Sequence, residues 1–253
     1  MPGVEAVVAA TRHTFARHTH DQYGIGVIVD GAQASASGRG PVEAVAGDVI
    51  TVNPDEVHDG APIGDSGRSW RMLYLAPALV ADLCADVSDG RITQGEFSNP
   101  VLTDPRLAAR FHRLFSLMIR GDDGLGEEEL LRLVGATLGT CSTTADPSIP
   151  QAIARARSRI DDDPAGTLTL SDLAREADLS RFQLLRGFAK ATGLTPHAYL
   201  VQRRLHLARR LIAGGLSLAE AAIASGFADQ SHMTRAFRQS YGLSPGTYAE
   251  AAR

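Results

Sequence analysis

Two arginines stand at matching places in an internal repeat of this chain. The run Gly-Leu-Thr-Pro-His-Ala-Tyr at Gly193–Tyr199 returns as Gly-Leu-Ser-Pro-Gly-Thr-Tyr at Gly242–Tyr248, and Arg186 and Arg235 each precede their glycine by seven positions. Such a period indicates one supersecondary unit used twice. A guanidinium carries paired N–H donors that match the O6 and N7 acceptors of guanine. The repeated arginines therefore predict a nucleic-acid partner.

Each repeat predicts a helix-turn-helix, whose second helix enters a DNA groove near its N-terminus. Glutamine suits adenine there, and an apolar side chain suits the thymine methyl group. The expected base-facing residues are Phe182, Gln183, Leu185, Arg186, Gln230, Ser231, His232 and Arg235. The expected phosphate contacts, which hold register without reading sequence, are Arg181, Lys190, Thr234 and Arg238.

Two alternatives stand beside this assignment. The repeated arginines are also explained as solvated surface residues bonded to local acids, and Phe182 and Leu185 as members of the helical core. Among the outward residues only the arginine recurs, so we expect the two units to read different half-sites. One chain should then prefer an asymmetric DNA target.

Three histidines form a second group with chemical potential. His18 and His20 flank one residue, and His58 follows after a strand and several turn residues. Imidazole is a ligand for Zn²⁺ and Fe²⁺, so three rings converging inside a small barrel would suit either ion. The alternative is that these histidines hydrogen-bond to the barrel or to an organic effector. The expected effector-binding residues are His18, His20, Tyr23, His58 and Trp70, with Asn53 and Tyr74 behind them.

Capping residues mark the helices that would carry the repeat. We expect one helix pair at Ser171–Ala177 and Ser180–Thr192, and a second at Ser217–Ser225 and Asp229–Tyr241. A helix from Thr195-Pro196 to about Ala213 should join them and span about 27 Å. That length would let both second helices enter successive major grooves, which lie about 34 Å apart. The arginines on this connecting helix are expected to be solvated or ion-paired: Arg203, Arg204, Arg209 and Arg210.

The first part of the chain has the pattern of strands followed by helices. Short β-prone runs between turn residues predict a small barrel or sandwich: Ile25–Val29, Val49–Val52 and Met72–Leu75. Helical periodicity then predicts three helices: Ala78–Val87, Asp104–Arg120 and Glu127–Leu138. The three leading glutamates of the last suit a helix N-terminus. The apolar stripes of the last two helices either pack on the barrel or form a dimer seam.

Charge is distributed unevenly along the 253 residues. Residues 1–149 contain 11 Arg and 20 Asp plus Glu, a net charge of −9, whereas residues 150–253 carry a net charge of +5. This asymmetry is expected when only the second part meets phosphates. Cys84 and Cys141 have no metal-ligand spacing, which indicates reduced thiols. With no apolar run of membrane-spanning length and no signal peptide, we expect a soluble, cytoplasmic protein.

The repeat carries a family resemblance. The first unit resembles the first motif of the AraC-type (arabinose-regulator/XylS) transcription factors through Leu173-Ala174, Ser180, Leu184, Phe188, Gly193–Pro196, Tyr199 and Arg203-Arg204. The second unit resembles their second motif through Ala221-Ala222, Gly226-Phe227, Phe237, Gly242–Pro245 and Tyr248. This resemblance implies promoter DNA as partner, contact with RNA polymerase and a homodimer.

The histidine region resembles the cupin-type effector-binding domain of the same family. The matching residues are His18-Thr19-His20, Gly31, Gly47-Asp48, Pro54 and His58. Metal-dependent cupin enzymes carry an acidic ligand after the His-x-His pair, and Tyr23–Gly26 supplies none. We therefore predict an organic effector with no metal and no other cofactor; a metal-binding cupin with enzymatic or metal-sensing activity is the alternative. No nucleophile–base pair, phosphate-binding glycine loop or carboxylate pair indicates catalysis.

The sequence thus predicts an α+β chain of two domains: a cupin-like β-barrel with a helical pair, then an all-α double helix-turn-helix. The expected boundaries are 1–80 for the barrel, 81–142 for the helical region and possible dimer contact, 143–149 for a linker, and 150–253 for the DNA-binding domain. The expected function is transcriptional regulation controlled by a small-molecule effector.

Overall fold

The computed structural model describes residues 1–88, 95–120, 123–138 and 149–251. The chain divides into two compact units, with the change at residues 144–145. The predicted linker, 143–149, lies almost wholly outside the described residues, and so does Cys141. Residues 15–18 form a strand that is hydrogen-bonded in the β-structure of the first unit.

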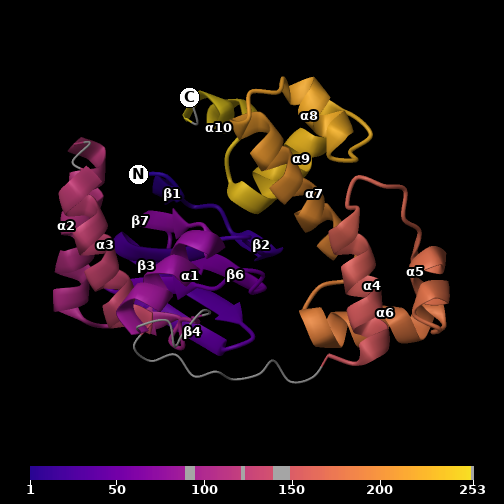
Figure 1. Ribbon diagram of the computed structural model, residues 1–253, viewed down its shortest axis with the longest axis horizontal. Helices are drawn as coiled ribbons and strands as arrows, with labels where there is room; N and C mark the ends of the chain where they lie inside the picture. Colours follow the sequence, from indigo (N-terminus) through magenta and orange to yellow (C-terminus); the bar gives the residue numbers. More distant parts are fainter. Residues whose placement is uncertain (89–94, 121–122, 139–148, 252–253) are drawn as a thin grey trace. The chain divides into compact units, whose positions relative to one another are not determined.

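The first unit is built on antiparallel β-structure (Figure 1). Its strands are β1 (Val4–Thr11), β2 (Phe15–His18), β3 (Tyr23–Ser37), β4 (Gly40–Val45), β5 (Val49–Val52), β6 (His58–Pro62), β7 (Arg68–Leu75) and β8 (Val101–Leu102). One path of neighbours runs β1-β7-β3-β5-β8, and β4 and β6 pair with the later part of β3 while β2 pairs with β6. The predicted strands are confirmed. The long strand β3 pairs with β5 and β7 and also with β4 and β6, so it belongs to both sets of paired strands.

An irregularity in β3 allows this one strand to pair with different neighbours along its length. Its first part pairs with β5 and β7, and the register against β7 shifts between Ile28 and Asp30. Gly31 follows with a φ of 76°, and a Cβ there would lie 2.3 Å from the carbonyl oxygen of Gly67. Only glycine fits so close a backbone approach at positive φ. From Ala32 onward the strand pairs with β4 and β6 instead.

Three helices cover one face of this sheet: α1 (Pro77–Ser88), α2 (Pro105–Arg120) and α3 (Asp123–Leu138) (Figure 1). Phe111 and Leu114 of α2 and Leu133 of α3 are fully buried, in one cluster with Ile25 and Leu73 of the sheet. The apolar stripes therefore pack on the β-structure, the first of the two sequence alternatives.

The start of α3 differs from the sequence expectation. The helix begins at Asp123, one turn before Glu127, so the three glutamates do not form its first turn. Glu129 is buried and lies 3.6 Å from Arg110 and 3.5 Å from Arg132. Two glycines near the start lower helix propensity. The predicted helix therefore began after them, later than the observed one.

The second unit is helical: α4 (Gln151–Asp162), α5 (Leu170–Glu176), α6 (Arg181–Thr192), α7 (Pro196–Ala213), α8 (Leu218–Ala224), α9 (Gln230–Tyr241) and α10 (Pro245–Ala251). The pair α5–α6 and the pair α8–α9 are the two predicted helix-turn-helix units. As expected, Ser180 and Asp229 cap α6 and α9 with their side chains. Gly193 and Gly242 end the same helices in nearly identical left-handed conformations, with φ of 76° and 73°. The α+β, two-domain fold is thus confirmed. None of the described helices is both long enough and apolar enough to cross a membrane.

The turn between α8 and α9 gives a stability prediction. Gly226 has a φ of 86°, and a Cβ there would lie 2.7 Å from the Ala165 carbonyl oxygen. Gly226→Ala should lower the free energy of unfolding by on the order of 2–3 kcal/mol, because backbone strain and a steric clash add. Chemical denaturation of the full chain measures this loss.

Gly215→Ala is the matched control. Gly215 also has a positive φ, 92°, but a Cβ there meets nothing within 4 Å. It should cost about 1 kcal/mol, from backbone strain alone. Equal losses for the two variants would contradict the predicted clash.

Candidate nucleic-acid interface and histidine cluster

The outward faces of α6 and α9 carry the residues predicted to read DNA. On α6, Phe182 is 66% exposed and Leu185 is 36% exposed. Arg186 is exposed too, and its guanidinium lies 5.5 Å from the centre of the Phe182 ring. Phe182 and Leu185 therefore do not belong to the helical core. On α9, the exposed members of the predicted set are Gln230, Ser231 and Arg235.

Five cations on these two helices have no carboxylate beside them. They are Arg181, Arg186, Lys190, Arg235 and Arg238, all exposed, and neither helix contains an acidic residue. Among the described residues, none of the five lies in an ion pair. By contrast, Arg175 of α5 lies 2.8 Å from Asp172. The alternative of local acid partners is thus excluded for Arg186 and Arg235 within the described chain.

Three of the residues predicted to contact DNA are partly buried or make contacts within the helical unit. The Gln183 side chain accepts a hydrogen bond from the Ser180 backbone N–H at 2.9 Å, completing a capping box. His232 is partly buried and packs edge-on against Phe227, with ring centres 5.2 Å apart. Thr234 is partly buried as well. These side chains therefore have structural roles that the outward pattern alone does not show.

Two arginines of α7 stabilise the helical unit: Arg203 is ion-paired, as expected, whereas Arg204 binds backbone carbonyls. Arg203 lies 2.9 Å from Asp161, and Arg204 donates to the carbonyl oxygens of Pro164 and Gly166 at 2.8 and 3.0 Å. Guanidinium groups held by carbonyls and a carboxylate position the loop after α4.

The core beneath the two units is also repeated. Phe188 packs edge-on against Tyr199 with ring centres 5.5 Å apart, and Phe237 lies 5.8 Å from Tyr248. Both phenylalanines are fully buried. Each second helix is therefore fixed to the helix that follows it, which leaves its opposite face outward.

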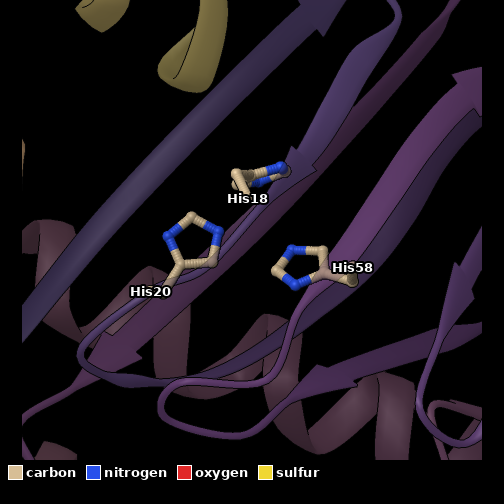
Figure 2. A group of neighbouring side chains, drawn as sticks. All are labelled: His18, His20 and His58. Carbon is tan, nitrogen blue, oxygen red and sulfur yellow. The ribbon is translucent and has the colours of Figure 1, made fainter. Parts of the chain in front are cut away.

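In the first unit, the structure brings the three predicted histidines together. His18 ends β2, His20 follows it, and His58 begins β6 (Figure 2). One ring nitrogen from each lies within 4.8 Å of the others. His18 and His20 are buried and His58 is partly buried. The cluster offers three converging imidazoles.

Backbone carbonyls orient two of these rings. The Nδ1 of His18 lies 2.8 Å from the Ala16 carbonyl oxygen, and the Nδ1 of His58 lies 2.9 Å from that of Glu56. A carbonyl oxygen only accepts, so each Nδ1 carries a proton, and in the neutral form of either ring the lone pair lies on Nε2. The His20 ring contacts the ring of Tyr74 in a tilted arrangement, with ring centres 5.0 Å apart.

The loop before β6 fixes His58 through a partly buried ion pair. Arg39 Nε lies 2.7 Å from Glu56 Oε1, and the same guanidinium donates to the Phe97 carbonyl at 2.7 Å. Burial lowers the pKa of His58 to about 4; the Glu56 carbonyl opposes this shift and the charge of Arg39 adds to it. The His58 ring is therefore neutral at neutral pH.

The other predicted effector residues make contacts of their own within the domain. Tyr23 belongs to the hydrophobic cluster under the helices and donates its hydroxyl to the Gly95 carbonyl at 2.6 Å. Trp70 lies beneath the Arg68 guanidinium, 5.1 Å from its ring centre. Asn53 uses its side-chain amide on both the N–H and the C=O of Phe97. The structure thus joins Tyr74 to the histidines and leaves Tyr23 on the helix-covered face.

Sequence reasoning missed two arginines that hold the domain together. Arg68 is buried and donates to the Gln33 side chain and to the Gly60 and His13 carbonyl oxygens. Arg39, within a Gly-Arg-Gly turn, supports the loop beneath His58. No spacing in the sequence distinguishes either one from a surface arginine.

Comparison with known protein families now gives the identity. The AraC-like ligand binding domain matches residues 2–134, more than half of the chain, and a helix-turn-helix domain matches residues 173–251. The chain belongs to the AraC family of transcriptional regulators. It is a DNA-binding regulator with a ligand-binding domain, which confirms the family predicted from the repeat.

Individual relatives agree with this assignment. An uncharacterized HTH-type transcriptional regulator of Bacillus subtilis, YbfI, is 30% identical over 225 residues, covering 87% of this chain and 81% of its own. The crystal structure of ToxT from Vibrio cholerae covers 100% of this chain and 99% of its own, at 13% identity and a TM-score of 0.60. ToxT bound to an unsaturated fatty acid matches with a TM-score of 0.58 at 16% identity, over 97% of this chain and 94% of its own. These two structures share the fold.

The exposure of α6 gives a test of its two faces. Phe182→Ala should change the free energy of unfolding by less than about 0.5 kcal/mol, since the ring lies on the surface. Phe188→Ala should cost about 3–5 kcal/mol, because it leaves a cavity in the core. Chemical denaturation of both variants measures the difference in the free energy of unfolding. A large loss for Phe182→Ala would contradict its surface position and assign the residue to the core.

Proposed function

We propose that this AraC-family chain binds promoter DNA through α6 and α9 and alters transcription in response to a small molecule bound in its first domain. The observation that carries the DNA part is the set of five exposed cations on two helices that contain no acid. Uncompensated cations on a surface are the usual partners of phosphates. The domain boundaries at 80, 142 and 149 remain our proposed division of the chain.

The two recognition helices divide into reading and positioning residues. Arg186 and Arg235 are proposed to read guanine, with Phe182 and Leu185 contacting thymine methyl groups. Arg181, Lys190 and Arg238 are proposed to bind phosphate. Gln230 and Ser231 are proposed to contact DNA from the same face of α9. Gln183, His232 and Thr234 are proposed to contact DNA through the side-chain atoms that remain exposed. The two faces differ, which favours an asymmetric operator.

The effector is proposed to bind at His18, His20 and His58, beside Tyr74. These rings are buried, converge and include neutral imidazole acceptors, which suits an organic ligand with hydrogen-bond donors. Tyr23, which belongs to the hydrophobic cluster under the helices, is left out of this proposed site, whereas Trp70 stays in it. ToxT binds an unsaturated fatty acid, so this class belongs in an effector screen.

Several further elements of the proposal come from family membership. Bound at a promoter in the cytoplasm, the chain would contact RNA polymerase and act as an activator. It would act without catalysis. The homodimer would use a surface other than the apolar stripes of α2 and α3, because their buried residues pack on the sheet.

Arg235→Ala tests base reading. It should weaken binding to the preferred operator by about 1–3 kcal/mol and relax preference at one base position. Arg238→Ala should instead weaken binding to all sequences alike and lower the salt slope by about one. Fluorescence anisotropy against an operator mapped by footprinting, with a library varied at each position, measures both.

Arg175→Ala is the control for these variants. Arg175 is 80% exposed but ion-paired on α5, so its removal should leave DNA affinity unchanged. A uniform loss for Arg235→Ala on all sequences would make Arg235 a phosphate contact and overturn its assigned role.

A thermal-shift screen tests the effector part. Sugars, amino acids, aromatic acids and an unsaturated fatty acid are added singly to the full chain, and a binder raises the melting temperature. We expect the hit to lose its effect in His20→Ala. A hit that acts equally on His20→Ala would move the effector site away from the histidines.

A further inference from the structure

The three-histidine cluster has the composition of a metal site. Each ring contributes a ligand nitrogen, and the three nitrogens lie within 4.8 Å of one another. They come from two short segments, with His18 and His20 separated by one residue and His58 on β6 (Figure 2). We propose that His18, His20 and His58 bind a divalent transition-metal ion of the Zn²⁺ class.

The spacing of the ligand atoms is close to what such an ion requires. Zn–N bonds of about 2.0–2.1 Å in a tetrahedral site place nitrogens about 3.3–3.4 Å apart. The three rings lie around a shared space (Figure 2), so a bound ion would have to draw nitrogens that are now within 4.8 Å of one another to that separation.

The hydrogen bonds behind the rings match those of metal-ligating histidines. Such a histidine donates its second ring N–H to a carbonyl or carboxylate, which fixes its tautomer and orientation. His18 does so to Ala16 at 2.8 Å and His58 to Glu56 at 2.9 Å. Both rings thus have Nε2 as the basic nitrogen, the atom that a metal binds.

The loop that supports the cluster connects two of its members. The Asp55 backbone N–H donates to the His20 carbonyl oxygen at 2.7 Å, so the residues before His58 are fixed to His20. The nearby Arg39 is paired with Glu56 at 2.7 Å, which offsets its repulsion of a second cation. These contacts hold the histidines in place before an ion binds.

The ligand count points to a site with an open position. Three protein ligands plus water or substrate are typical of zinc sites that interact with a further molecule. In the described chain, the cluster contains three histidines and no carboxylate or thiolate ligand. Three neutral imidazole ligands would leave the positive charge of the ion uncompensated. The ion would therefore attract a ligand that is anionic or that donates a lone pair. This deepens the proposed function, on which its regulatory meaning rests: the ion would take the imidazole lone pairs, and the effector would then bind the ion through a donor atom of its own instead of hydrogen-bonding to the rings.

Calorimetry on the full chain tests the metal site. Protein stripped with a chelator is titrated with Zn²⁺ in the absence of DNA, and elemental analysis gives the stoichiometry. We expect one ion per chain, and a loss of affinity of at least about 100-fold for His58→Ala and for His20→Ala. His13→Ala is the matched control, since His13 is exposed and lies outside the cluster; it should bind as wild type.

A cysteine variant with a new absorption band tests the same site if the alanine variants fail to fold. With Co²⁺ in place of Zn²⁺, His58→Cys should add a thiolate-to-cobalt charge-transfer band in the near ultraviolet, and His13→Cys should add none. Absence of stoichiometric zinc in the wild type, or of the band in folded His58→Cys, would overturn the proposal.

The same measurements separate this inference from the proposed DNA function. All metal readouts use DNA-free protein, and Arg235→Ala should bind Zn²⁺ as wild type does. Failure of the operator experiments would therefore leave the metal result standing, and the reverse also holds.

Discussion

The candidate DNA surface depends on one packing interaction made twice. In each helix-turn-helix unit, a fully buried phenylalanine on the second helix packs against a tyrosine on the following helix. A left-handed glycine ends each second helix and turns the chain so that this contact forms. With one side of α6 and α9 fixed inward, the opposite side must face solvent. The exposed cations and Phe182 follow from that constraint.

The sequence predicted this part well because its signals are local. Caps, C-terminal glycines and the 3.6-residue period each act within one turn, so Ser180, Asp229, Gly193 and the buried Phe188 could be placed from the residues alone. The histidine group could also be found from the sequence, since two histidines separated by one residue and a third histidine after a loop are a recognisable pattern. Its actual convergence needed the β2–β6 pairing.

What the sequence could not predict are the contacts between distant segments. Tyr23 and Tyr74 are both aromatic residues on strands, and only the strand register shows that they lie on different faces. Arg39 and Arg68 resemble surface arginines until the carbonyl groups that surround them are known. The start of α3 was misplaced for a related reason: packing on the sheet overrides the low propensity of its glycines.

The capping pattern has a consequence for how such a protein changes its targets. In the first unit Gln183 closes the cap of α6, so replacing it to alter recognition would also weaken the helix. At the matching place of the second unit stands His232, whose backbone N–H alone serves the Asp229 cap. A mutation there leaves the cap intact. In the proposed interface, the cap therefore constrains this position in the first unit and not in the second, where the ring contact of His232 with Phe227 is the remaining constraint.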